Sequence, residues 1–363
     1  MSGPGIVFVD ANTIWHRRLA DALGKVRPTL ALLPKTDVFC RQNEAEGEPG
    51  ETVYVSVGLP PGWASRTAGI SQALLARRVE APAKRFGGAV IILSSPAYAP
   101  LAERLSGRFP IVSYLADDYR SYTGWTDSAR REKRLMDRAT MRVFVSEALR
   151  ARAVAEHGYP RETTFVSPNA TERRFGPEGA GAERPVGLET LPRPILGVLG
   201  GVSTRLDLET IGRIAALPTV GTLLVAGPVD QALLDEQPWL RGPGVHITGR
   251  LPHDEMHRYA HAMDAALIPY AETPLNFHCS PMRLYDHLAT GVPIYALPAC
   301  GQIRSAPADG IVVGNADQLV AEISRELSVL RYHRQTAEYL WISRAEGLVG
   351  ALDRMFATTE RTQ

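Results

Sequence analysis

The 363-residue sequence has little cysteine and no long apolar run. Its three cysteines, Cys40, Cys279 and Cys300, are widely spaced and form no metal-binding pattern, so we expect a reducing, cytoplasmic compartment. A membrane-spanning helix needs about 20 consecutive apolar residues, and no segment approaches that length. The N-terminal residues lack the basic flank of a signal peptide, which also favours a cytoplasmic protein.

Lysine is absent from residues 195–363. This absence argues against a phosphorylase that would hold pyridoxal phosphate through a lysine of the second half. Hydrophobic residues make up 45% and charged residues 22% of the chain, as in a globular protein. A chain of this length is too long for one ordinary core and indicates two domains.

The net charge is only +1, but it is unevenly distributed. Residues 1–175 hold 25 Lys and Arg against 18 Asp and Glu, and residues 176–363 hold 15 against 21. The basic half is suited to an anionic partner such as a phospholipid surface or a lipid-linked pyrophosphate. A solvated helix face is the alternative, and its basic residues are Arg130, Arg131, Lys133, Arg134, Arg138 and Arg142. Nucleic acid is not expected, since no aromatic residues are interleaved with these charges.

Short apolar runs alternate with helical patterns through the first half, which predicts a parallel sheet wrapped by helices. The predicted strands are 6–9, 30–33, 53–57, 89–93, 111–115, 142–145 and 164–166. The predicted helices are 15–23, 69–79, 99–105, 130–137 and 147–156.

A second alternating series begins after a segment rich in Gly and Pro. The predicted strands are 195–199, 222–225, 245–248, 265–269 and 293–297, and the predicted helices are 206–217, 253–263, 282–290, 316–330 and 332–356. We therefore expect an α/β fold with an N-terminal domain 1–175, a linker 176–194, a C-terminal domain 195–340, and a final segment 341–363 that packs back toward the first domain.

The sharpest local motif is Cys279-Ser-Pro-Met-Arg-Leu-Tyr-Asp286. Ser280 as N-cap and Pro281 as the first helical residue predict a well-defined helix start. The free N–H groups of such a start attract an anion, and Arg283 adds a positive charge. A diphosphate suits this site, although a structural helix with an exposed Arg and Asp is an equal alternative.

A second motif, Gly200-Gly-Val-Ser-Thr-Arg205, follows a predicted strand directly. Its small residues allow close approach of the backbone to a ligand, and Arg205 can complement phosphate charge. The spacing is neither that of a dinucleotide fingerprint nor that of a P-loop. A tight turn without a ligand explains it equally well.

The second-half motifs form an ordered series: 197–209, 224–229, 246–252, 263–270, Asn276 and 280–294. This series resembles the donor domain of GT-B glycosyltransferases, in the bacterial family 4-like group that includes teichuronic-acid and exopolysaccharide enzymes. The resemblance is close over 195–345 and looser over 110–170. It implies two doubly wound, Rossmann-like parallel-sheet domains that face each other across a cleft.

The resemblance implies a set of donor-binding residues. Those near the diphosphate and the sugar are Gly200, Gly201, Ser203, Arg205, Ser280, Pro281, Met282 and Arg283. Gly249 and Arg250 would lie beside the base, and Asp286 would bind the ribose. Tyr270 and Asn276 would line the approach to the phosphate-binding helix start. Two positions depart from the pattern, because Arg283 stands for the usual Lys and Asp286 for the usual Glu. An earlier Glu of the family motif has no counterpart.

In the first half, Tyr114-Leu-Ala-Asp-Asp-Tyr119 resembles the strand that ends in an acidic pair in these enzymes. Asp117 and Asp118 are the candidates for a general base that deprotonates the acceptor, if transfer inverts the anomeric centre. A helix cap and a solvated carboxylate are the alternative roles. Trp15, His16 and Arg17 fall where relatives face the acceptor, although core packing explains Trp15 equally well.

These inferences predict a metal-independent glycosyltransferase with no cofactor apart from a UDP- or GDP-sugar as co-substrate. The acceptor would be a glycan or a lipid-linked molecule, and the enzyme would be cytoplasmic, at the inner face of the membrane. Two alternatives remain open: a GT-B sugar epimerase, and a non-catalytic subunit that binds a nucleotide sugar.

Overall fold

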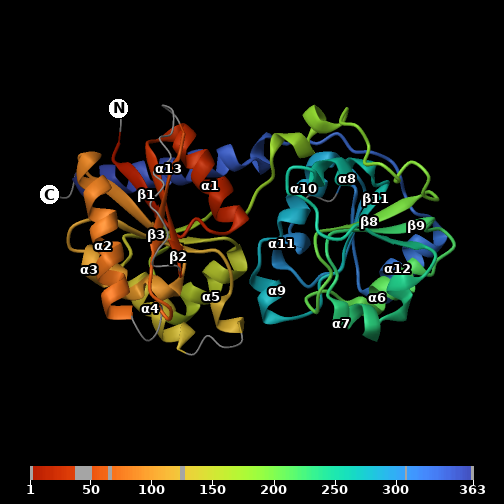
Figure 1. Ribbon diagram of the computed structural model, residues 1–363, viewed down its shortest axis with the longest axis horizontal. Helices are drawn as coiled ribbons and strands as arrows, with labels where there is room; N and C mark the ends of the chain where they lie inside the picture. Colours follow the sequence, from red (N-terminus) through yellow and green to blue (C-terminus); the bar gives the residue numbers. More distant parts are fainter. Residues whose placement is uncertain (1–2, 37–50, 64–67, 123–126, 307–308, 361–363) are drawn as a thin grey trace. The chain divides into compact units, whose positions relative to one another are not determined.

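The computed structural model describes residues 3–36, 51–63, 68–122, 127–306 and 309–360 (Figure 1). The chain consists of two compact units. Unit 1 contains residues 1–169 and 341–363, and unit 2 contains residues 170–340. Residues 176–194, which we expected to be a linker, are counted with unit 2.

Unit 1 contains a seven-stranded parallel sheet in the order β3-β2-β1-β4-β5-β6-β7. Its strands are β1 Gly5–Val9, β2 Thr29–Lys35, β3 Val53–Gly58, β4 Ala89–Leu93, β5 Ile111–Leu115, β6 Met141–Phe144 and β7 Thr164–Val166. All seven predicted strands are confirmed, with small shifts at their ends. The central strands β1, β4 and β5 are entirely buried, as expected for a parallel sheet covered on both faces.

The helices of unit 1 cover the two faces of this sheet. They are α1 Ile14–Val26, α2 Ala68–Arg85, α3 Ala99–Leu105, α4 Ser128–Arg138, α5 Glu147–His157 and the C-terminal α13 Trp341–Glu360. Right-handed crossovers place α1 on one face and α2 to α4 on the other, because β1 to β2 and β3 to β4 run in opposite directions across the sheet.

The last helix of the chain, α13, packs against α1 within unit 1. Both guanidinium Nη atoms of Arg27 donate to the carboxylate of Asp353, at 3.0 and 2.9 Å. Arg27 is buried and Asp353 is half exposed, so the pair anchors α13 at the C-terminal end of α1.

Unit 2 contains a six-stranded parallel sheet in the order β10-β9-β8-β11-β12-β13. Its strands are β8 Ile195–Leu199, β9 Thr222–Ala226, β10 Val245–Ile247, β11 Ala265–Ile268, β12 Ile294–Ala296 and β13 Ile311–Val313. Five of these were predicted. The edge strand β13 was not predicted.

The helices of unit 2 are mostly short. They are α6 Leu208–Ala215, α7 Gln231–Glu236, α8 Met256–Ala262, α9 Pro274–His278, α10 Met282–Thr290, α11 Gly301–Arg304 and α12 Ala316–Arg325. The predicted helix at 282–290 agrees exactly in its bounds with α10. The helices α7, α9 and α11 were not predicted, since four to six residues hold less than two helical turns.

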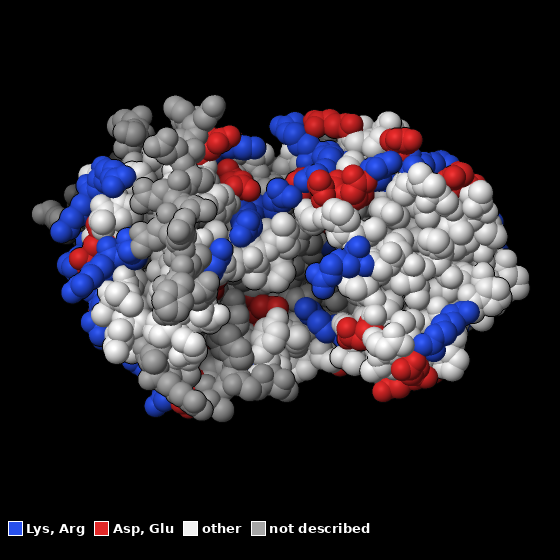
Figure 2. All heavy atoms as spheres, in the orientation of Figure 1, with Lys and Arg blue, Asp and Glu red and all other residues white. Residues whose placement is uncertain are grey.

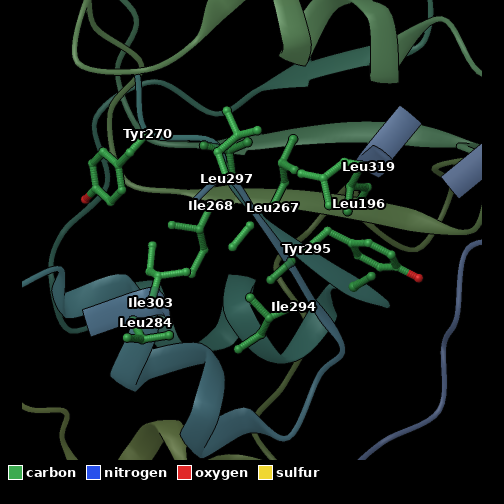
Figure 3. Packing of buried hydrophobic residues seen from close by; sticks show 14 of the residues in the cluster. Leu196, Leu267, Ile268, Tyr270, Leu284, Ile294, Tyr295, Leu297, Ile303 and Leu319 are labelled. Atoms are coloured by element: carbon green, nitrogen blue, oxygen red, sulfur yellow. The ribbon is translucent and has the colours of Figure 1, made fainter. Parts of the chain in front are cut away.

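The core of unit 2 joins the sheet to these helices (Figure 3). Leu267, Ile294 and Tyr295 come from neighbouring strands, while Leu284 from α10 and Leu319 from α12 pack against them. All five side chains are at most 2% exposed. This packing fixes the position of α10 below the sheet.

Two predicted helices, 316–330 and 332–356, are confirmed only in part, by α12 and α13. Residues 326–330 and 332–340 are not α-helical, apart from a short 3-10 turn at Ala337–Tyr339. Backbone contacts hold this segment instead, because the N–H of Tyr332 donates to Gly291 O at 2.8 Å. The guanidinium of Arg331 donates to the carbonyls of Thr290, His261 and Met263. Helical periodicity cannot reveal such long-range partners.

Gly24 is a tight contact point between α1 and the segment that begins β3. A Cβ at Gly24 would lie 2.3 Å from Thr52 Oγ1 and 2.8 Å from Thr52 N. The variant Gly24→Ala should therefore lower the free energy of unfolding by about 1–3 kcal/mol, the usual cost of overpacking. The measurement is urea-induced unfolding followed by circular dichroism.

Gly69→Ala is the matched control, because a Cβ there meets nothing within 4 Å in α2. Alanine has the higher helix propensity, so this variant should be neutral or more stable by up to about 1 kcal/mol. Equal effects of the two substitutions would contradict the packing at Gly24.

Candidate functional site

Several of the predicted donor-binding residues of unit 2 meet at the carboxyl edge of its sheet. Gly200 and Gly201 follow β8, Gly227 follows β9, and Tyr270 lies two residues beyond β11. The carboxyl ends of parallel strands share one edge, which is where open α/β sheets bind ligands. The helix α10 begins near this edge, and its residues approach the loop after β8.

The loop after β8 needs glycine for two reasons. Gly200 has φ +90°, a left-handed conformation that other residues rarely adopt. A Cβ at Gly200 would lie 3.1 Å from an Nη of Arg283, and a Cβ at Gly227 would lie 2.4 Å from the carbonyl carbon of Gly200. The bare backbone therefore allows Arg283 and the β9 loop to approach closely.

Two guanidinium groups lie over the ring of Tyr270. The Cζ atoms of Arg205 and Arg283 are 5.7 and 5.2 Å from its centroid. The Nη1 atom of Arg283 is buried and has no hydrogen-bond partner among the residues that the structure describes. A buried charged donor without a partner costs free energy, and a hydrogen-bond acceptor would remove that cost. Figure 3 shows Tyr270 at one end of the hydrophobic cluster.

Asn276 positions Arg205. Its side chain is fully buried, and its Oδ1 accepts a hydrogen bond from Arg205 Nε at 3.0 Å. Its Nδ2 donates to the carbonyls of Arg205 and Ala271, both at 2.8 Å. Asn276 thus connects the loop after β8 to the loop after β11 and orients the guanidinium.

The N-cap of α10 lies one residue later than predicted, although the bounds of the helix agree. Pro281 is the N-cap, with extended backbone at φ −74° and ψ 117°, and Ser280 lies one residue before it. The side chain of the N-cap residue, Pro281, makes no cap hydrogen bond. Proline, without an N–H, loses no hydrogen bond at this place. The helix start therefore combines the positive end of the helix dipole with the charge of Arg283.

Asp286 lies deeper in α10 and is enclosed. Thr171 Oγ1 donates to its Oδ1 at 2.6 Å, and the residue is only 6% exposed. The pKa of Asp286 is raised to about 8, and burial is the largest cause. The hydrogen bond from Thr171 and the charge of Arg283 act to lower this pKa, whereas the charge of Glu172 acts to raise it. The carboxyl group of Asp286 is therefore mostly protonated at pH 7. Thr171 was not singled out in the sequence, where nothing signals a partner 115 residues away.

His287 follows Asp286 on the same helix and is fully buried. Neither ring nitrogen has a hydrogen-bond partner among the described residues. Burial, and then the nearby charge of Arg283, lower the pKa of His287 to about 3, so the ring is neutral.

The remaining predicted donor residues are more peripheral. Gly249, with φ +73°, and the exposed Arg250 follow β10, two strands from β8. Ser203 Oγ accepts a 3.4 Å hydrogen bond from the N–H of Arg205 and so stabilises that turn. Met282, the first residue of α10, is half-buried.

In unit 1 the structure separates the two acidic candidates. Asp118 is 2% exposed, and its carboxylate accepts from Arg152 Nη1 at 2.5 Å and from Ser121 Oγ at 2.9 Å. The same Arg152 donates to the fully buried Glu132, so Asp118 belongs to an internal ion-pair network. Asp117 is partly exposed and accepts a 2.5 Å hydrogen bond from Tyr122 Oη.

The first helix of unit 1 places its aromatic residues inward. His16 is 3% exposed, contacts the rings of Phe8 and Tyr114, and has its Nδ1 3.0 Å from Asp10 O. Burial lowers the pKa of His16 to about 4. The rings of Trp15 and His16 make an edge-to-face contact, whereas Arg17 is exposed.

Asp10 is a polar residue of unit 1 that the sequence analysis did not identify. It follows β1 with φ 73°, which is uncommon for a residue other than glycine. Burial raises the pKa of Asp10, while the hydrogen bond from Asn12 Nδ2, 2.7 Å long, lowers it. The signal in the sequence was Val9-Asp-Ala-Asn12, an acidic residue directly after an apolar strand.

Two of the cysteines lie side by side. Cys279 and Cys300 are buried thiols with their Sγ atoms 4.0 Å apart. The hydrogen bond between them lowers the pKa of Cys300 to about 7, against the effect of burial. Cys40 lies outside the described residues.

No group of three or more His, Cys, Asp or Glu side chains that could hold a metal ion occurs in the described parts of the chain. Metal independence stays a prediction. Within the same parts, none of the helices combines the length and the apolar character needed to cross a membrane.

These two parallel-sheet units, with the polar loops of unit 2 at the carboxyl ends of its strands, define the GT-B fold, as predicted. Comparisons with solved structures support this assignment. Sucrose-phosphate synthase from Thermosynechococcus elongatus has a TM-score of 0.71 and 16% identity, covering 98% of this chain and 100% of that one. Anabaena HepE in complex with UDP-glucose has a TM-score of 0.64 and 15% identity, covering 99% and 100%.

One curated relative is similar in sequence over part of its length. The putative teichuronic acid biosynthesis glycosyltransferase TuaH of Bacillus subtilis is 30% identical over 113 residues. These residues are 30% of this chain and 28% of TuaH, so the match spans under a third of either protein. No family model matches the chain.

The raised pKa of Asp286 has a consequence for stability. Between about pH 4, where a free Asp ionises, and pH 8, the native state keeps a proton that the unfolded state releases. The unfolded state binds fewer protons, so this contribution to stability is complete below pH 4 and is lost at about 1.4 kcal/mol per pH unit as the pH rises to 8.

Asp286→Asn keeps the side chain neutral and should abolish this loss. Denaturant unfolding at pH 5 and pH 8 measures it, and the variant should gain a few kcal/mol on the wild type between the two values. The exposed Asp254 provides the control, because Asp254→Asn should leave the pH dependence unchanged. A wild-type-like pH profile for Asp286→Asn would contradict the protonated carboxyl group.

Proposed function

We propose that this protein is a glycosyltransferase. It moves a sugar from a UDP- or GDP-linked donor to a glycan or lipid-linked acceptor during synthesis of a surface polysaccharide or glycoconjugate. The observation that carries the proposal is the buried Nη1 of Arg283, which has no hydrogen-bond partner among the described residues, at the start of α10 and near Arg205. The partial likeness to TuaH and the fold shared with UDP-bound HepE support it.

The chemistry of transfer needs stabilisation of the leaving group. The acceptor oxygen forms a bond to the anomeric carbon of the sugar, and the bond from that carbon to the β-phosphate oxygen breaks. Negative charge grows on the nucleoside diphosphate as this bond breaks. Preformed cations and helix N–H groups stabilise such charge without reorganisation, which is the role proposed for Arg205, Arg283 and the start of α10.

The proposed donor site uses the rest of the predicted set around these charges. Gly200 and Gly201 allow the diphosphate to approach the backbone, and Asn276 keeps Arg205 oriented. Asp286 is proposed to contribute near the ribose as a neutral carboxyl group, because burial keeps it protonated. Gly249 and Arg250 are proposed to lie beside the base.

Asp117 is the proposed general base for an inverting transfer. A base must take the proton of the acceptor hydroxyl, so it must be accessible to the acceptor. Asp117 is partly exposed, whereas Asp118 is buried and committed to Arg152. Trp15, His16 and Arg17 stay proposed acceptor-side residues, of which Arg17 is the exposed one.

Other parts of the proposal rest on the sequence alone. The enzyme would act without a metal or a further cofactor, in the cytoplasm and at the inner face of the membrane. A non-catalytic subunit that binds a nucleotide sugar is the second candidate, favoured by the absence of a counterpart to the earlier Glu of the family motif. Hydrolysis of the donor by the purified protein distinguishes an enzyme from such a subunit.

Removal of the Arg283 guanidinium tests the donor site. Charge-assisted hydrogen bonds contribute about 1.5–3 kcal/mol, so Arg283→Ala should raise the Kd for UDP or GDP by about 10- to 100-fold. Isothermal titration calorimetry measures the affinity. Arg283→Lys should fall between the wild type and the alanine variant, since it keeps the charge and loses the planar fork.

Arg213→Ala is the matched control for this experiment. Arg213 is an exposed residue of α6 that pairs with Asp317 at 2.7 Å, and its loss should change the Kd by less than about twofold. Unchanged affinity in Arg283→Ala, or an equal loss in both variants, would remove the donor-site assignment.

Asp117→Asn and Asp118→Asn should behave differently. Asp117→Asn should abolish transfer while nucleotide affinity and unfolding stay at wild-type values, because only the proton acceptor is lost. Asp118→Asn should lower the free energy of unfolding by about 2 kcal/mol or more, because Arg152 loses a buried partner. Radiolabelled sugar transfer and thermal unfolding provide the two readouts; full activity of Asp117→Asn would exclude it as the base.

A further inference from the structure

The outer side of α2 presents one continuous stripe of exposed side chains. Ile70 is 68% exposed and Leu74 is 41% exposed, so the N-terminal part of the stripe is apolar. The C-terminal part is basic and consists of Arg77, Arg78, Lys84 and Arg85. The other five residues follow Ile70 by four, seven, eight, fourteen and fifteen positions. At 3.6 residues per turn, these spacings put all six residues on one side of the helix.

The opposite side of α2 is committed to the core of unit 1. Leu75, Val79 and Ala83 lie on that side and are entirely buried. The exposed stripe therefore cannot turn inward without unpacking the helix. Its two large apolar side chains stay exposed to solvent, at a cost that a partner would remove.

Two neighbouring helices extend the basic surface. The helix α3 packs against both α2 and α4, and the sheet crossovers put all three on the same face. Figure 2 shows Lys and Arg side chains gathered over the part of unit 1 where Figure 1 draws α2 and α3. The helix α3 adds Arg104 and α4 adds Arg138, both exposed and without an ion-pair partner among the described residues. The other exposed basic residues of α3, its following turn and α4 are paired with acidic residues: Arg108, Arg130, Lys133 and Arg134.

The acidic residues of this surface are already paired. Glu80 pairs with Arg108 at 2.7 Å, and Glu103 pairs with Arg134 at 2.8 Å. Asp137 pairs with Lys133 at 2.7 Å. The four basic residues of the α2 stripe have no ion-pair partner among the described residues, so their charge is available to an external anion.

The combination of apolar and basic groups selects the partner. A lipid bilayer offers an apolar boundary next to a layer of phosphate groups, and amphipathic helices bind there with their apolar side chains inserted and their Lys and Arg side chains at the headgroups. A single-stranded nucleic acid would call for aromatic side chains that stack on bases, and α2 contains none.

We propose that the exposed stripe of α2, supported by the basic residues of α3 and α4, docks on the surface of an anionic phospholipid bilayer. Ile70 and Leu74 enter the headgroup boundary, and Arg77, Arg78, Lys84 and Arg85 bind lipid phosphates. The docking surface lies in unit 1 and does not depend on the donor site of unit 2. It deepens the proposed function by naming the membrane as partner, with a lipid-linked acceptor as the reason to dock.

Vesicle co-sedimentation of the full chain tests this surface. The wild type should bind phosphatidylglycerol vesicles, bind phosphatidylcholine vesicles at least tenfold less well, and be released from the former by high salt. Each basic residue near an anionic surface contributes about 1 kcal/mol, or fivefold, so Arg77→Ala/Arg78→Ala should lower the partition coefficient by about 25-fold. Ile70→Ser/Leu74→Ser should lower it by about tenfold at both low and high salt.

The matched control is Lys25→Ala/Lys35→Ala, which removes two exposed charges from α1 and the end of β2. It should change the partition coefficient by less than about threefold. Equal losses for the control and for Arg77→Ala/Arg78→Ala, or no wild-type binding to phosphatidylglycerol, would overturn the proposal. So would equally tight wild-type binding to a single-stranded oligonucleotide, because that result identifies a general polyanion surface.

Circular dichroism and UDP affinity keep the two proposals distinguishable. All of these substitutions lie at exposed positions of unit 1, so the spectrum and the nucleotide Kd should stay at wild-type values. Vesicle binding without UDP binding would leave the docking surface intact and contradict only the donor site. The opposite result would contradict only the docking surface.

Discussion

The site of unit 2 depends on two guanidinium groups that lie over one aromatic ring. Like charges repel each other, and the arrangement is tolerated because the electron-rich face of Tyr270 attracts both and because Asn276 ties Arg205 to two loops. The contacts do not satisfy every donor, since Nη1 of Arg283 is buried without a described partner. An anion bound there would both neutralise the charge and complete the hydrogen bonding.

The parallel sheets explain why residues far apart in sequence reach this place. Each strand of unit 2 ends at the same edge, so the loops after β8 and β11 and the start of α10 converge, although 80 residues separate Gly200 from Ser280. Core residues of α10 such as Leu284 then hold that helix against the sheet. Site and core are thus parts of one packing arrangement.

Burial decides the chemical character of several candidate residues. Asp286 is mostly protonated at neutral pH and His287 is uncharged, because neither side chain reaches water. In unit 1 the same principle divides the acidic pair, since Asp118 is enclosed with Arg152 while Asp117 keeps access to solvent. Two adjacent residues of the same type therefore receive different roles, one structural and one available for chemistry.

The sequence by itself determined every strand of the two sheets except β13, the bounds of α10, and the resemblance that implies a diphosphate near Gly200, Arg205 and Arg283. Apolar runs and the Gly-Gly and Ser-Pro signals are local, so they can be recognised without the fold. Only the tertiary structure decided the features that depend on distant partners. Thr171 donates a hydrogen bond to Asp286, and Asn276 accepts one from Arg205. Residues 326–340 do not form an α-helix, and within them the N–H of Tyr332 donates to a distant carbonyl group. These contacts join positions up to 115 residues apart, and no periodicity in a sequence records which distant groups will meet.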